Sequence, residues 1–142
     1  MKIKEILRTK GHSVLTITQS ITVLEAVQIL VEQNIGGLVV VNEDGPVGIL
    51  TERDILRLTA QRPGEFDSIQ VGTVMTRSLI TATADDDHIE LMSVMTENKI
   101  RHLPIMDGDR LAGIISIGDL LNVCRTVAEE ENSQLKHYIR GT

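Results

Sequence analysis

The sequence contains very few cysteine and aromatic residues. Its 142 residues include one cysteine, Cys124, and two aromatic residues, Phe66 and Tyr138. A single cysteine excludes an internal disulfide and any cysteine-rich metal site, so we expect Cys124, among apolar neighbours, to be a buried packing thiol. Two aromatic side chains are too few to build a base-stacking platform for nucleic acid.

Long apolar runs and excess positive charge are also missing. The longest apolar runs, such as Leu38 to Val41, are far shorter than the roughly 20 residues of a membrane span. No apolar stretch follows the first lysines, so we expect no secretory signal and a cytoplasmic location. With 14 basic and 20 acidic residues the formal net charge is −6, which disfavours nucleic acid as a partner.

An internal repeat organises what is present. When the sequence is shifted by 65 positions, residues 16–57 align with residues 81–122 without a gap, and 11 of the 42 aligned positions are identical. Most of the other pairs exchange one apolar residue for another. The identical pairs are Thr16/Thr81, Thr18/Thr83, Glu25/Glu90, Glu32/Glu97, Ile35/Ile100, Leu38/Leu103, Asp44/Asp109, Gly48/Gly113, Ile49/Ile114, Asp54/Asp119 and Leu56/Leu121. The chain is therefore a duplicated unit.

Each copy is predicted to fold as β-α-β-β-α. A short strand, near 14–17 or 79–82, precedes a helix whose first residues carry a capping signature, Thr22-x-x-Glu25 or Asp87-x-x-Glu90. Two β-rich runs with a short turn between them follow, 38–41 with 47–50 and 103–106 with 111–115. We expect one face of each first helix to be buried: Val23, Ala26, Val27, Leu30 and Val31 in one copy, and Ile89, Met92, Met95 and Thr96 in the other.

The copies are separated by a predicted linker and followed by a long helix. We place the first repeat at 1–62, the linker at 63–70, beside Arg62-Pro63-Gly64, and the second repeat at 71–142. After Asp119 the last helix is predicted to continue toward Ile139 with apolar residues at heptad spacing. We expect this extension to pack on the core or on a partner chain.

One motif occurs twice at the same place in the repeat. Residues 48–54 and 113–119 both follow the pattern Gly-apolar-apolar-Thr/Ser-x-x-Asp, and Lys99 to Ile105 leads into a strand of the second copy. These residues resemble the cystathionine-β-synthase (CBS) domain pair, also called a Bateman module. The resemblance covers residues 2–121 and extends to the accessory module of inosine-monophosphate dehydrogenase, whose catalytic barrel has no counterpart here.

The resemblance implies an α+β fold in which two repeats pack through their sheets around a pseudo-twofold axis and leave two clefts. In this family the clefts commonly hold AMP, ADP, ATP, NAD or S-adenosylmethionine, and stand-alone pairs usually form homodimers. It also implies that basic residues before the second strand face phosphates, which selects Arg101 and His102 in copy two. The matching positions of copy one are Gly36 and Gly37, where Arg53 is expected to compensate in part.

The motif residues have a physical reason to bind a nucleotide. An aspartate in the first turn of a helix can accept hydrogen bonds from both hydroxyls of a ribose, which selects Asp54 and Asp119. The helix N-terminus, with the hydroxyl of Thr51 or Ser116, favours a phosphate. The same pattern is also an ordinary helix cap.

An adenine would have to be held by aliphatic walls and backbone hydrogen bonds. We expect the strand residues to line it: Thr16, Thr18 and Val39 in one copy, and Thr81, Thr83 and Pro104 in the other. For the threonines, ordinary β-propensity is an equally good explanation.

The sequence does not favour an enzyme. It contains no nucleophile elbow, no His-x-x-x-His pair, no P-loop and no dinucleotide-binding glycine pattern. Consecutive side chains at Asp85-Asp86-Asp87-His88 point in different directions, so we expect no metal site and no obligatory cofactor. We predict a non-catalytic regulatory homodimer that binds an adenosine-containing ligand and signals to an unidentified target protein. The alternative is a dimerising interaction module with vestigial clefts.

Overall fold

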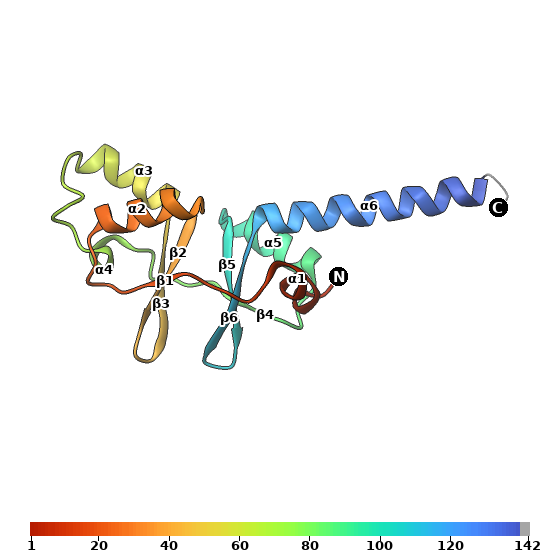
Figure 1. Cartoon of the computed structure of the whole chain (residues 1–142), viewed down its shortest axis with the longest axis horizontal. Coiled ribbons are helices and arrows are strands. Elements are labelled where there is room, and N and C mark those ends of the chain that lie inside the picture. Colours follow the sequence, from red (N-terminus) through yellow and green to blue (C-terminus); the bar gives the residue numbers. More distant parts are fainter. Residues whose placement is uncertain (140–142) are drawn as a thin grey trace.

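The computed structural model describes residues 1–139 and contains two three-stranded sheets, one in each repeat (Figure 1). In each sheet the middle strand pairs in parallel with the first strand and antiparallel with the third. The helices and strands are α1 (Ile3–Lys10), β1 (Thr16–Ile17), α2 (Val23–Gln33), β2 (Gly37–Asn42), β3 (Gly45–Thr51), α3 (Glu52–Gln61), α4 (Val71–Val74), β4 (Ala82–Thr83), α5 (His88–Asn98), β5 (His102–Asp107), β6 (Arg110–Ser116) and α6 (Ile117–Ile139). The α+β fold with two repeats is confirmed.

The two hairpins are formed as predicted and carry the same irregularity. Asn42 pairs with Gly45 and Asp107 with Arg110, so each turn has two residues between its strands. Gly108 has a φ of 61° within its turn, a conformation that glycine adopts without steric cost. The register of each hairpin shifts once, between Val40 and Val41 and at the matching place in the second copy.

The predicted caps of the first helices are present. Thr22 Oγ1 accepts a hydrogen bond from Glu25 N at 3.1 Å, and Asp87 Oδ1 accepts one from Ile89 N at 3.0 Å. Each bond satisfies a backbone donor that has no partner within the helix, so these residues determine where α2 and α5 begin. Both helices end in a left-handed residue, Asn34 or Lys99.

The buried faces of α2 and α5 differ from the prediction at their edges. In α2, Val23, Ala26 and Leu30 are buried, whereas Val31 is 74% exposed. In α5 the buried residues are His88, Leu91 and Met95, while Ile89 is 65% exposed and Thr96 is also exposed. Each misplaced residue directly follows a buried one and is therefore turned about 100° around the helix, away from the sheet.

Two helices that were not predicted from the sequence, α1 and α4, each pack in the core of the other repeat. Helix α1 lies at the start of the first repeat in sequence but contributes Ile3, Ile6 and Leu7 to the core of the second, and it lies beside β4 and α5 in Figure 1. Helix α4 follows the linker but contributes Val71 to the core of the first repeat, beside Met75. Each of the proposed repeats, 1–62 and 71–142, therefore lends one helix to the hydrophobic core of the other.

The first strand of each sheet is short. β1 pairs with β2 only at Val39 and Val40, and β4 pairs with β5 only at Ile105 and Met106. The predicted strands at 14–17 and 79–82 therefore extend too far toward the N-terminus.

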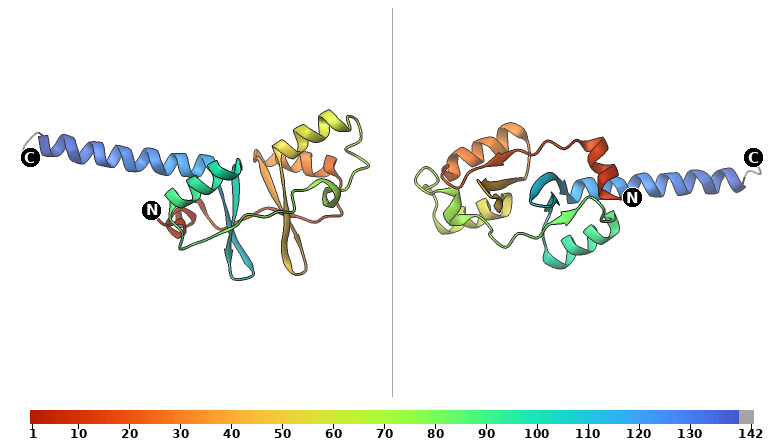
Figure 2. Two further views of the ribbon diagram at one scale, coloured as in Figure 1. Left: turned by 180° about the vertical axis from the view of Figure 1, so that it is seen from behind. Right: turned by 90° about the horizontal axis from the view of Figure 1, so that it is seen from below.

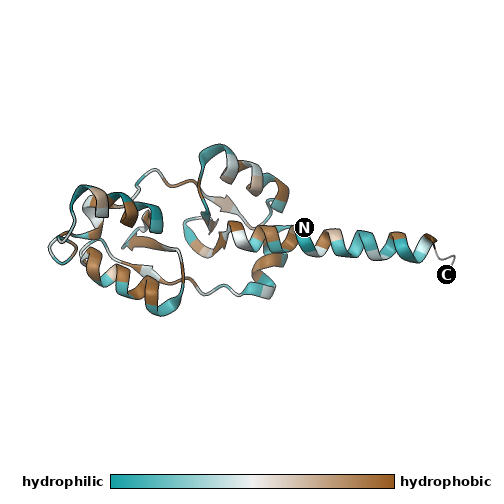
Figure 3. Cartoon of the chain, turned by 90° about the horizontal axis from the view of Figure 1, so that it is seen from above, coloured by the Kyte–Doolittle hydropathy of each residue, from teal (hydrophilic) through white to brown (hydrophobic). Residues whose placement is uncertain are grey.

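Helix α6 is confirmed as a long C-terminal extension. Its buried residues, Leu120 and Val123, lie in its first third, and the rest of the helix projects away from the body (Figures 1 and 2). Apolar residues recur along the projecting part (Figure 3), including Leu135, which is 57% exposed. Only the beginning of α6 therefore packs on the core. Within residues 1–139 no helix has both the length and the apolar character needed to cross a bilayer.

Candidate functional site

The two motif aspartates lie at the N-termini of α3 and α6, and both cap their helices. Asp54 Oδ2 accepts a hydrogen bond from Thr51 N at 2.9 Å, and Asp119 Oδ2 accepts one from Ser116 N at 2.8 Å. In return, Asp54 N and Asp119 N donate to the hydroxyls of Thr51 and Ser116. The cap uses Oδ2 of each carboxylate and leaves Oδ1 outside it.

The motif glycines allow a segment from outside the repeat to pack closely on the sheet. A Cβ at Gly48 would lie 2.6 Å from Met75 Sδ and 2.9 Å from the carbonyl oxygen of Thr76, and a Cβ at Gly113 would lie 2.6 Å from Leu7 Cδ2. Only a residue without a Cβ permits these approaches. The glycine of each motif therefore positions the exchanged segment next to the aspartate of that motif.

The two segments that cross between the repeats, 3–10 with α1 and 71–76 with α4, supply a different partner to each aspartate. At the first motif, Thr76 Oγ1 donates to Asp54 Oδ1 at 3.1 Å. At the second, Lys10 Nζ lies 2.6 Å from Asp119 Oδ2 and donates to the carbonyl oxygen of Ile114 at 2.7 Å. Neither Thr76 nor Lys10 was predicted as a site residue, because both lie outside the aligned repeat.

A cavity of about 650 Å³ lies between the repeats on the side of the second motif. The first repeat contributes the loop 33–37, the second repeat contributes His102, Ile114 and Ser116, and the segment 10–15 closes the cavity between them. The lining residues are Lys10, Ser13, Val14, Leu15, Gln33, Asn34, Ile35, Gly36, Gly37, His102, Ile114 and Ser116. Of the predicted site residues, His102 and Ser116 line this cavity, and Lys10 connects it to Asp119.

The glycine pair of the first repeat makes room for His102. A Cβ at Gly37 would lie 3.2 Å from His102 Cγ, and one at Gly36 would lie 3.1 Å from His102 Cε1 and 2.6 Å from Glu52 Oε1. Gly37 and His102 occupy the same position of the repeat, so the small residue of one copy faces the large residue of the other. The sequence already contained this difference, since Gly36-Gly37 of the first copy aligns with Arg101-His102 of the second.

The environment shifts the pKa values of the two titratable groups of this cleft. Burial lowers the pKa of His102, since desolvation penalises the imidazolium; Glu52 opposes this effect, and the positive charge of Lys10 adds to it. Partial burial by itself would raise the pKa of Asp119, but the hydrogen bonds from Lys10 and the Ser116 backbone outweigh it, and the net pKa is lowered. At neutral pH, Asp119 is therefore ionised and His102 is mostly uncharged.

The other predicted residues occupy different places. Val39 and Pro104 are buried within the sheets. Arg101 is exposed, and Arg53 Nη1 donates to the carbonyl oxygen of Lys99 at 3.2 Å. The four threonines of the first strands, Thr16, Thr18, Thr81 and Thr83, are exposed, and none of these eight residues lines the cavity beside Ser116.

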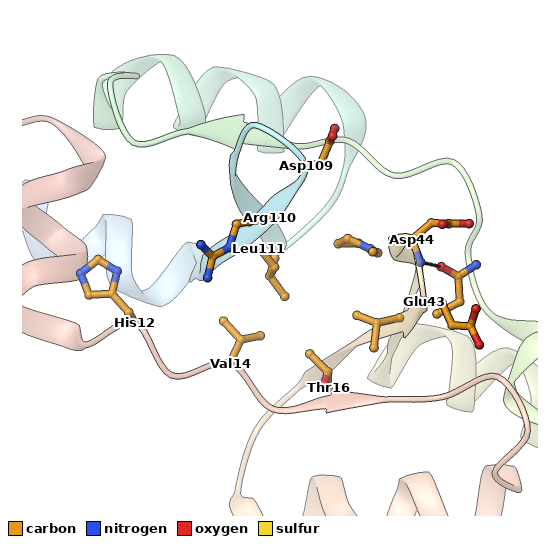
Figure 4. Close-up of a pocket in the computed structure, with 12 residues that line it drawn as sticks. His12, Val14, Thr16, Glu43, Asp44, Asp109, Arg110 and Leu111 are labelled. Carbon is orange, nitrogen blue, oxygen red and sulfur yellow. Dashed lines mark hydrogen bonds between the residues drawn. The ribbon is translucent and has the colours of Figure 1, made fainter.

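Thr16 instead lies in a second cavity, of about 610 Å³, between the ends of the two hairpins (Figure 4). Glu43 and Asp44 line it on one side, and Asp109 and Arg110 line it on the other. These residues belong to the hairpin turns and lie at the far end of the strands from the two motif aspartates.

Cys124 is half-buried rather than buried, and its Sγ lies 3.3 Å from Met92 Sδ.

Comparisons with known proteins agree with the repeat and the motifs. A family model described as "CBS domain" matches residues 3–60 and 71–125. The mitochondrial CBS domain-containing protein CBSX3 of Arabidopsis thaliana is 35% identical over 148 residues, which cover 98% of this chain and 72% of that protein. The crystal structure of a CBS-domain protein from Agrobacterium tumefaciens is 34% identical, with a TM-score of 0.84, and the match covers 87% of this chain and 98% of that one.

A second similar structure contains ligands. The CBS domain pair of protein MJ0100, in complex with 5′-methylthioadenosine and S-adenosyl-L-methionine, is 29% identical to this chain. The TM-score is 0.79, and the match covers 89% of this chain and 97% of that one.

Proposed function

Because the chain belongs to the family of CBS-domain proteins and carries a pair of these domains, we propose that it is a non-catalytic regulatory module that binds an adenosine-containing ligand between its repeats. The candidate ligands are AMP, ADP, ATP, NAD and S-adenosylmethionine. The carrying observation is the juxtaposition of the Asp119 helix N-terminus, Ser116 and Lys10 with a cavity that both repeats line. The bound nucleosides of the MJ0100 domain pair support this class of ligand.

Each part of such a ligand has a counterpart in the cleft. The carboxylate of Asp119 accepts hydrogen bonds from the ribose hydroxyls, and Ser116 with the N-terminus of α6 favours a phosphate. The aliphatic side chains of Val14, Leu15 and Ile35 line the same cavity, and Leu15 is 44% exposed. We propose these three residues, in place of the buried Val39 and Pro104, as the walls for an adenine.

The first cleft is proposed to be the weaker site. Asp54 and Thr51 form the corresponding helix N-terminus, but both carboxylate oxygens of Asp54 already accept hydrogen bonds, from Thr51 and from Thr76. Arg53, the expected compensating charge, is bonded to the carbonyl oxygen of Lys99. A ligand at this site would share Asp54 Oδ1 with the Thr76 hydroxyl.

We further propose that the protein is a homodimer that offers a ligand-dependent surface to a target protein. Leu56 of α3 and Leu121 of α6 occupy the same position of the repeat and are 72% and 54% exposed. Two apolar side chains related by the pseudo-twofold axis suit a symmetric contact with a second copy. A ligand regulates such an assembly only if it binds its states with different affinities.

Thermal denaturation and calorimetric titration test the ligand class. With AMP, ATP, NADH and S-adenosylmethionine, a ligand at 100 times its Kd is expected to stabilise the protein by about 2.7 kcal/mol. We expect Asp119→Ala to weaken binding about tenfold or more. Asp54→Ala should affect only the first cleft, and the control Asp67→Ala, at an exposed linker residue, neither cleft.

The outcomes separate the proposed functions. Stabilisation by none of the four ligands would favour the alternative, a dimerising interaction module with vestigial clefts. Formation of a product during incubation with ATP, abolished by Asp119→Ala, would instead show that the chain is an enzyme.

A further inference from the structure

The strongest unassigned feature of the cleft is the ion pair between Lys10 and Asp119. Lys10 Nζ lies 2.6 Å from Asp119 Oδ2, and the side chains are only 33% and 25% exposed. A charged hydrogen bond at this distance, partly shielded from water, is stronger than an ion pair on an open surface. Lys10 therefore neutralises the carboxylate that is proposed to bind the ribose.

Lys10 is held in place by the helix that carries it. It is the last residue of α1, and the apolar side chains Ile3, Ile6 and Leu7 anchor that helix in the core of the second repeat. The ammonium also donates to the carbonyl oxygen of Ile114, on the strand that leads to the motif. An ammonium has three hydrogens, and these two partners leave one donor for a ligand in the cavity that Lys10 lines.

Asp54, at the other motif, has no such ion pair within the described residues. The residue that the exchanged segment places on Asp54 is the neutral Thr76, and no cation among residues 1–139 forms an ion pair with Asp54. The hydrogen bonds around Asp119 use Oδ2, and within the described residues Oδ1 accepts none. The second cleft thus combines a carboxylate oxygen that accepts no hydrogen bond within the described residues with a fixed positive charge.

We infer that Lys10 determines the charge class of the ligand, so that the cleft at Asp119 takes a phosphate-bearing adenosine ligand in preference to an uncharged or sulfonium-bearing one. This inference rests on the proposed nucleotide-binding function. With Lys10 present the carboxylate is neutralised and one ammonium hydrogen can bind a phosphate oxygen. Without Lys10 the carboxylate would repel a phosphate and attract a sulfonium cation.

The test compares ligands that share the adenosine but differ in charge. Calorimetric titrations with AMP, 5′-methylthioadenosine and S-adenosylmethionine are made on the unmodified chain and on Lys10→Met, which keeps the length of the side chain. We expect the unmodified chain to bind one AMP per chain at least tenfold more tightly than 5′-methylthioadenosine. In Lys10→Met we expect AMP affinity to fall about tenfold or more, 5′-methylthioadenosine affinity to change less than threefold, and S-adenosylmethionine affinity to rise.

A matched variant controls for a change in net charge. Lys4 lies on the same helix as Lys10, and its Nζ is 3.8 Å from Oδ1 of the exposed Asp85. The variant Lys4→Met should leave the affinities for all three ligands unchanged. If all three ligands lose affinity equally in Lys10→Met, Lys10 only supports the structure, and the inference is wrong.

Two further outcomes need only the unmodified chain. Equal affinities for AMP and 5′-methylthioadenosine would overturn the role of Lys10 and leave the proposed function intact, even if Lys10→Met did not fold. Absence of binding by all three ligands would contradict the proposed function itself.

Discussion

His102 lies where the repeats meet, with its ring against the backbone of Gly36 and Gly37. The charged groups around it act in opposite directions: Glu52 and Asp119 favour the imidazolium, whereas Lys10 and Arg101 disfavour it. Burial outweighs all of them, so the pKa of His102 is below its ordinary value of 6.5. The folded protein therefore holds His102 neutral at a pH where the unfolded chain begins to take up a proton.

This shift predicts a loss of stability in mild acid. Below about pH 6.5 the unfolded state binds more protons at His102 than the folded state does. The free energy of unfolding therefore decreases as the pH is lowered, until the pH reaches the pKa of the folded state. In His102→Gln this contribution is absent, and the decrease between pH 7.5 and 5.5 should be smaller. Urea denaturation at several pH values measures both curves.

The control for this prediction is His12→Gln, because His12 is an exposed histidine. It should retain the pH dependence of the unmodified protein. Parallel curves for the unmodified chain and His102→Gln would show that His102 is not the group responsible.

At the scale of elements, the exchange of α1 and α4 joins the repeats into one structure. Each of these helices packs in the core of the repeat to which it does not belong in sequence. Leu7, on α1, is fully buried and contacts the position of Gly113 on β6. The core of the second repeat is therefore incomplete without residues from the start of the first.

Leu7→Ala is expected to destabilise the protein by about 2–5 kcal/mol, because it removes a fully buried side chain and leaves a cavity that the sheet cannot fill. Since α1 also holds Lys10, the same change should weaken AMP binding. Chemical denaturation and calorimetric titration measure the two effects.

Val31→Ala is the matched control, since Val31 is equally apolar in the sequence pattern but 74% exposed. Its effect on the free energy of unfolding should stay within about 0.5 kcal/mol. Similar losses in both variants would contradict the burial of α1.

At the scale of the whole molecule, two sets of exposed apolar residues are candidates for contacts between copies. Leu56 and Leu121 are on the body, whereas Leu135, Tyr138 and Ile139 are on the projecting part of α6. The two sets allow different contacts between copies. The body set is related by the internal pseudosymmetry, while the α6 set extends beyond the repeat.

We expect the protein to sediment as a dimer and Leu56→Glu to weaken association at least tenfold, because the carboxylate would be desolvated at the proposed contact. Sedimentation equilibrium over a range of concentrations measures the dissociation constant. Thermal denaturation should show that the variant still folds, since Leu56 is 72% exposed.

A chain that ends at Val127 separates the two sets. It keeps both buried residues of α6, Leu120 and Val123, so the fold should be retained. Dimerisation retained in this shortened chain but lost in Leu56→Glu would support the body contact. The reverse result would assign association to the end of α6 and contradict the proposed dimer.

The repeat and its motifs could be predicted from the sequence because they depend on local patterns. Helix caps such as Thr22 and Thr51 depend on residues three positions apart, and hairpins depend on alternation and turn residues. The same local logic selected Asp54 and Asp119 as the candidate carboxylates for ligand binding. The sequence by itself thus determined the family, the α+β repeat and the two helix N-termini.

The partners of those carboxylates were decided only by the tertiary structure. Lys10 and Asp119 are 109 positions apart, and no periodic pattern connects them. Their contact exists because α1 crosses to the second repeat, where Gly113 gives space to Leu7. The packing of α1 on the second repeat is driven by burial of apolar surface. This driving force does not depend on how far apart the residues are in the chain, so local sequence patterns do not predict the contact.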